Sequence, residues 1–76
     1  MEYNLERDGR RTGVVLRFYS SLLAVEDVRT GEQYLCKLRG RFKRQGIRPI
    51  TGDIVEYRVV VGNEGVVEIS SIERTN

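Results

Sequence analysis

The strongest constraint on the fold is a two-residue alternation of apolar and polar side chains, repeated in short segments that turn residues separate. A period of two places successive side chains on opposite faces and is typical of β-strands. The stretch between the third and fourth segments lacks the apolar period of a long helix. We therefore predict five strands, which cover residues 12–19, 22–28, 32–39, 53–61 and 66–73.

The same alternation predicts which side chains share a face. Leu23 and Val25 should point inward, and Cys36 falls on an apolar face of the third strand. Arg17 and Tyr34 are possible residues of a binding face, and Tyr34 alternates with Cys36 and Leu38 on one face of the third strand. In the first strand the two expected faces are Val14, Leu16 and Phe18 against Val15, Arg17 and Tyr19.

The order of the segments predicts the architecture. Three strands form a meander, a longer connection follows, and a tight turn at 62–65 joins the last two strands. A small sheet avoids exposed edges best by closing on itself. We predict an all-β fold, a five-stranded OB-fold Greek-key barrel over 12–76, with a short helical turn around 42–45 and a loose arm at 1–11. An SH3-like barrel is the main competitor.

Composition argues against catalysis and against a membrane protein. The chain has 76 residues, no histidine and one cysteine, so four Cys/His zinc ligands cannot be assembled. Cys36 is expected in the core, and Asp53 is expected to serve a turn. No apolar run approaches the roughly 20 residues that span a bilayer. We expect a cytoplasmic protein without catalytic site, metal or cofactor, and a monomer because no extensive apolar patch is predicted.

Positive charge is concentrated between residues 37 and 52. Six basic side chains and no acidic one occur there, and because the whole chain carries +2, the remainder carries −4. Such segregation creates a local field that suits phosphates, although a solvated basic loop has the same composition. Phe42 should plug the barrel bottom rather than stack on bases. The candidate RNA-binding residues here are Lys37, Arg39, Arg41, Lys43, Arg44 and Arg48.

Tyr19 ends the first strand and is followed by Ser20 and Ser21. A tyrosine at this position can stack on a base or cap the barrel. Both interpretations stay open at the level of sequence.

Three stretches resemble a known family: "TGVVLRFYSSLLAVED", "GEQYLCKLRGRFKRQGIRPITGDIVEY" and "EGVVEISSIERTN". They are similar to the N-terminal OB domain of the ribosome-small-subunit-dependent GTPase A family (RsgA, also called YjeQ). The resemblance implies a barrel that docks a GTPase on 16S rRNA of the small (30S) ribosomal subunit during late maturation. By position it implies RNA contacts from Tyr19, Ser20 and Ser21 and from the basic stretch.

The family's GTPase domain and zinc-binding domain have no counterpart in this sequence. The resemblance therefore implies that GTP and zinc belong to the full-length family and not to this chain, which is either a cut-out or a free-standing relative. Two alternatives remain: a small-subunit-binding protein like bacterial translation initiation factor 1, and an OB scaffold that binds an acidic protein.

Overall fold

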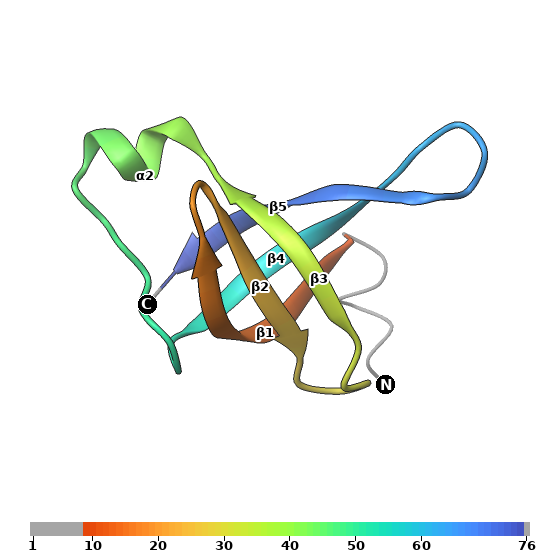
Figure 1. Cartoon of the computed structure of the whole chain (residues 1–76), viewed down its shortest axis with the longest axis horizontal. Helices are drawn as coiled ribbons and strands as arrows, with labels where there is room; N and C mark the ends of the chain where they lie inside the picture. The colour runs from red at the N-terminus through yellow and green to blue at the C-terminus, as the bar shows by residue number, and fades with distance from the viewer. Residues whose placement is uncertain (1–8, 76) are drawn as a thin grey trace.

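The computed structural model describes residues 9–75, which form five strands and one short helix (Figure 1). Strand β1 begins two residues before the predicted barrel boundary, and the rest of the expected arm, residues 1–8, lies outside the described residues. No helix among residues 9–75 has the length and apolar character needed to cross a membrane. The elements are β1 (Arg10–Tyr19), β2 (Leu22–Asp27), β3 (Gln33–Leu38), α2 (Gly40–Arg44), β4 (Ile54–Val61) and β5 (Val67–Thr75).

The strands close into a barrel in the order β1-β2-β3-β5-β4, with β4 paired back to β1. The pairs are antiparallel except for β3 and β5, which run parallel from Cys36 and Ser70 to Leu38 and Ile72. This order confirms the OB-fold prediction. The hairpin between β4 and β5 extends beyond the barrel, on the side away from α2 (Figure 1).

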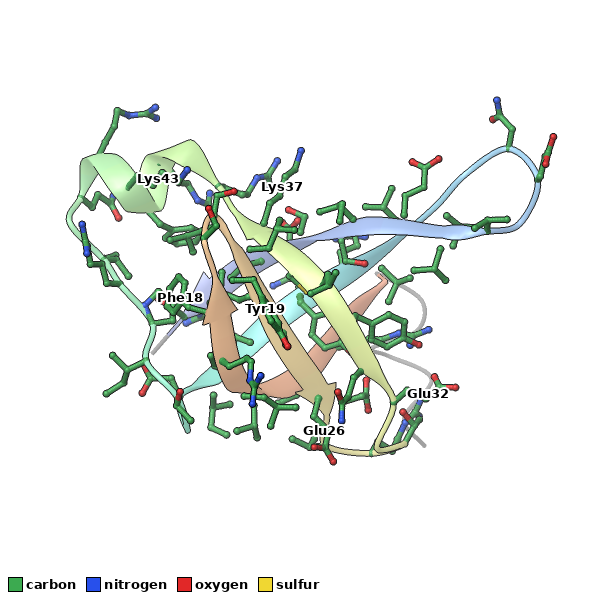
Figure 2. The ribbon with its side chains drawn as sticks, viewed as in Figure 1. Phe18, Tyr19, Glu26, Glu32, Lys37 and Lys43 are labelled. Atoms are coloured by element: carbon green, nitrogen blue, oxygen red, sulfur yellow. The ribbon has the colours of Figure 1, made fainter. Side chains whose placement is uncertain are left out.

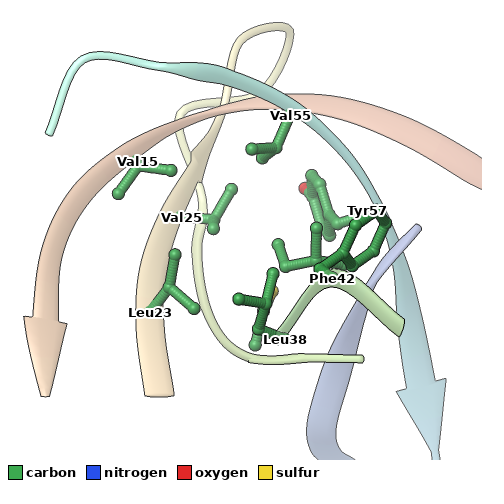
Figure 3. Close-up of a cluster of buried hydrophobic side chains, with 9 residues drawn as sticks. Val15, Leu23, Val25, Leu38, Phe42, Val55 and Tyr57 are labelled. Atoms are coloured by element: carbon green, nitrogen blue, oxygen red, sulfur yellow. The ribbon is translucent and has the colours of Figure 1, made fainter. Parts of the chain in front are cut away.

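The barrel interior holds one apolar cluster to which every strand and α2 contribute (Figure 3). Phe42 is 6% exposed, which confirms that it closes one end of the barrel. Cys36 is fully buried, and burial raises the pKa of its thiol to about 12, so that it is no thiolate nucleophile near neutral pH. The buried members are Val15, Leu23, Val25, Cys36, Leu38, Phe42, Val55, Tyr57 and Ile72.

An irregularity in β1 changes the expected faces. Val15 pairs with Val25, but the next paired residue is Arg17, so Leu16 is an extra residue in the ladder. An extra residue of this kind reverses the alternation that follows it. The prediction that Val15, Arg17 and Tyr19 share a face is therefore wrong. Beyond the bulge Phe18 pairs with the core residue Leu23, and Arg17 and Tyr19 point outward.

Tyr34 lies on the side of the sheet that packs against the core, as its alternation with Cys36 and Leu38 predicts. Its ring centroid lies 5.7 Å from that of Tyr57, and it packs partly buried against the core. The Tyr57 hydroxyl donates to Asp27 Oδ2 over 2.6 Å, and Asp27 Oδ1 accepts from the backbone N–H of Arg29 and of Thr30. These bonds tie β4 to the turn between β2 and β3.

The segment after α2 is anchored to β1 beside the bulge. The N–H of Gly52 donates to the carbonyl of Val15, and the N–H of Val15 donates to the carbonyl of Asp53. Gly52 has φ of 96°, a left-handed conformation that glycine adopts without strain. The Asp53 carboxylate accepts from the N–H of Ile50 over 2.9 Å, which confirms the expected turn role. The path from α2 to β4 is thus held against the middle of β1.

Candidate nucleic-acid interface

Helix α2 presents cations because its one apolar residue faces inward. Phe42 is the buried residue of the helix, and Arg41, Lys43 and Arg44 are exposed around it. The helix ends where Gly46 takes φ of 73° and its N–H donates to the carbonyl of Lys43. The guanidinium carbon of Arg41 lies 4.8 Å from the Phe42 ring centroid. The burial of one ring therefore fixes the direction of three positive side chains.

Two of the predicted cations are engaged with β5. Arg39 Nη1 lies 2.9 Å from Glu73 Oε1, and Arg41 Nη2 donates to the Glu73 backbone carbonyl over 2.7 Å. The stretch holds no acidic residue of its own, but Glu73 from a distant part of the sequence pairs with Arg39. The parallel pairing of β3 with β5 brings Glu73 to the start of α2. Within residues 9–75, no carboxylate forms an ion pair with Lys37, Lys43, Arg44 or Arg48.

Several side chains of opposite charge lie at opposite ends of the barrel. Figure 2 shows Lys37 and Lys43 at the α2 end, whereas Glu26 and Glu32 lie at the opposite end. The protruding hairpin between β4 and β5 carries further acids, Glu64 and Glu68. The loop between strands four and five commonly takes part in nucleic-acid binding by OB-folds. Its acids make it a poor phosphate ligand here.

The turn between β1 and β2 and the segment after α2 enclose a hollow of about 350 Å³. It brings together four predicted residues: Ser20 and Ser21 from the turn, and Lys43 and Arg48 from the basic stretch. Phe18 and Leu38 supply apolar walls, and we call the space the β1–α2 hollow. Sequence reasoning missed Phe18, although its place beside the turn at the strand end was an available signal.

Tyr19 lies outside the hollow, on the outer surface of the sheet. It pairs with Leu22, which in turn pairs with Lys37, so these three residues form a row across β1, β2 and β3. The ring is 47% exposed and does not cap the barrel, which removes that alternative. The guanidinium carbon of Arg17 lies 5.7 Å from the Tyr19 ring centroid. A cation already accompanies this aromatic ring.

A second surface is apolar and acidic, and differs in chemistry from the basic one. Leu35, Val67 and Ile69 line a wide groove between β3 and β5, together with Glu32 and Glu68. Each of the three apolar side chains is at least 40% exposed. These three side chains form an exposed apolar strip along the groove. The carboxylates make this groove unsuitable for a phosphate backbone.

Comparison with known proteins identifies the family. The RsgA N-terminal domain family matches residues 12–67. The small ribosomal subunit biogenesis GTPase RsgA of Thermotoga neapolitana is 49% identical over 59 residues, which cover 78% of this chain and 20% of that protein. RsgA of Staphylococcus aureus is 38% identical over 66 residues, covering 87% of this chain and 22% of that protein.

Solved structures agree with this assignment. The crystal structure of YjeQ from Thermotoga maritima matches with a TM-score of 0.68 and 42% identity, over 88% of this chain and 22% of that one. Translation initiation factor 5A from Methanococcus jannaschii, at 24% identity and a TM-score of 0.58, shares the fold alone. The chain spans about a fifth of the length of its RsgA relatives. It belongs to the RsgA N-terminal domain family.

Proposed function

We propose that this chain is an RNA-binding OB domain that docks a ribosome biogenesis GTPase on 16S rRNA of the small (30S) ribosomal subunit during late maturation. The observation that carries the proposal is the group of four cations without ion-pair partners among residues 9–75, namely Lys37, Lys43, Arg44 and Arg48. Two of them, Lys43 and Arg48, line the β1–α2 hollow together with Ser20 and Ser21. Exposed cations with no carboxylate to neutralise them are free to contact phosphates.

The names of the relatives supply the target. They are named small ribosomal subunit biogenesis GTPases, which supports the RNA of that subunit as the proposed polyanion. We infer that the chain contributes RNA contacts and that GTP hydrolysis belongs to the parts of the relatives that it does not match. The RNA contact requires no cofactor from this chain, and a monomer presents all four cations at one end of the barrel.

The direct test compares two charge-neutralising double variants. Lys43→Gln with Arg44→Gln should weaken filter binding to 16S rRNA about tenfold or more, because hydrogen bonds to charged groups contribute about 1.5–3 kcal/mol each. Arg10→Gln with Arg29→Gln changes the net charge equally but lies in β1 and in the turn after β2. This control should bind nearly as well as the unmodified chain. Equal losses in both variants would show a non-specific dependence on net charge and would sink the proposal.

Arg41 is deliberately left unchanged in that design. Its guanidinium donates to the Glu73 carbonyl and covers the Phe42 ring, so its replacement would also disturb the packing of α2. Lys43 and Arg44 make no such contacts among the described residues. A loss of binding in their double variant therefore reports on the interface rather than on folding. If the partner is instead an acidic protein, the chain should still capture that partner after nuclease treatment.

A further inference from the structure

Phe18 is placed unusually for an inward-facing residue. It pairs with Leu23, which is fully buried, yet Phe18 itself is 46% exposed. Phe42 fills the end of the barrel in its place, and the Phe18 ring is left as a wall of the β1–α2 hollow. Complete burial of a phenylalanine stabilises a fold, so this chain forgoes part of that stabilisation. The ring is available to a ligand.

The other walls of the hollow define what that ligand is. Ser20 and Ser21 provide hydroxyl groups that both donate and accept, and Lys43 and Arg48 provide positive charge. No Asp or Glu is among the described residues that line it. An aromatic plane, hydroxyls and cations in one small space match the three parts of a nucleotide: base, base edge or ribose, and phosphate.

Tyr19 is a weaker candidate for the same role, although it is the neighbouring exposed aromatic. The Arg17 guanidinium accompanies its ring, and Arg17 Nη1 lies 3.5 Å from the Tyr19 hydroxyl. Tyr19 also stands on an open sheet surface rather than in a hollow. Among residues 9–75 no cation lies over the Phe18 ring, and phenylalanine has no polar group of its own. The two rings are both labelled in Figure 2.

We propose that the β1–α2 hollow binds one unpaired nucleotide of an RNA, with its base stacked on Phe18 and its phosphate between Lys43 and Arg48. The inference rests on the proposed RNA-binding function. It adds a site at which the protein distinguishes an unpaired base from a base-paired RNA duplex. The serine hydroxyls can serve any base as donors or acceptors, so the site selects an extruded nucleotide more than a particular base.

The test uses a short RNA duplex with a single bulged 2-aminopurine and the same duplex without the bulge. The unmodified chain should bind the bulged RNA about tenfold more tightly, because base–aromatic stacking contributes roughly that factor or more per base. The fluorescence of 2-aminopurine should rise as the base leaves the RNA stack. Phe18→Leu should abolish both the preference and the fluorescence change, while its binding to the plain duplex stays the same.

Val28→Ala, at an apolar position that is 56% exposed in the turn after β2, is the matched control and should keep the preference. Circular dichroism checks that Phe18→Leu folds. Phe18→Tyr retains an aromatic ring and should therefore keep the preference that Phe18→Leu loses. Binding of both RNAs without a Phe18 effect would overturn the nucleotide site and leave RNA binding intact. Failure of the unmodified chain to bind either RNA would overturn both proposals.

Discussion

The Asp27 carboxylate is 3% exposed and is kept charged by hydrogen bonds. Burial alone would raise its pKa, but the Tyr57 hydroxyl and the N–H groups of Arg29 and Thr30 outweigh burial and lower it. Tyr57→Phe should therefore cost about 1–3 kcal/mol in the free energy of unfolding, since a buried acceptor loses its partner. Urea denaturation at neutral pH measures the loss. The control is Tyr34→Phe, whose hydroxyl donates to the exposed Glu32 and should cost less.

The pH dependence of that cost has a definite sign. Because the pKa of Asp27 is lower in the folded state, its contribution to stability is present above its ordinary pKa and is lost as pH falls through the folded value. Tyr57→Phe removes a hydrogen bond that lowers this pKa. The difference in unfolding free energy between the variant and the unmodified chain should shrink from neutral to acidic pH. A difference that grew on acidification would contradict this account of Asp27.

At the scale of elements, α2 depends on a single side chain. The helix has five residues, and Phe42 is the buried one. A helix this short is not stable by itself, so it forms because the ring packs into the barrel end. Phe42→Ala should cost about 3–5 kcal/mol and Phe42→Leu distinctly less. Thermal and urea unfolding report the cost, with Ile50→Ala at a 65% exposed position as control. A cost for Phe42→Ala no larger than that of the control would show that α2 is not a plug.

The elements also mark how far the sequence could be interpreted. The five strands and the inward Phe42 were predictable, because each depends on local alternation or on one apolar residue among cations. The face of the sheet on which each β1 side chain lies after Leu16 was not predictable. The bulge is held by partners that are distant in the sequence, β2 on one side and the segment at Gly52 and Asp53 on the other, and it leaves no local pattern.

At the scale of the whole molecule, the basic stretch was predictable in composition but not in pairing. Arg39 and Glu73 are separated by 34 residues and meet because β3 and β5 are parallel neighbours. Arg48 and Ser20 line one hollow by an equally long-range effect, since the segment after α2 is bonded to β1. Charge density can be counted in a sequence. Strand pairing in the closed barrel determines which of these cations form ion pairs and which can contact a ligand.

The number of available charges predicts the salt dependence of RNA binding. If the four cations without ion-pair partners contact phosphates, the slope of log K against log salt should be about −3 to −4, whereas all six would give about −4 to −5. The steeper value would mean that Arg39 and Arg41 leave Glu73 on binding. Removal of two contacts by Lys43→Gln with Arg44→Gln should reduce the slope by about 1.5. Binding to 16S rRNA over a range of KCl concentrations measures it. A slope that the double variant leaves unchanged would place the phosphate contacts elsewhere on the barrel, since only lost phosphate contacts reduce the number of counterions released.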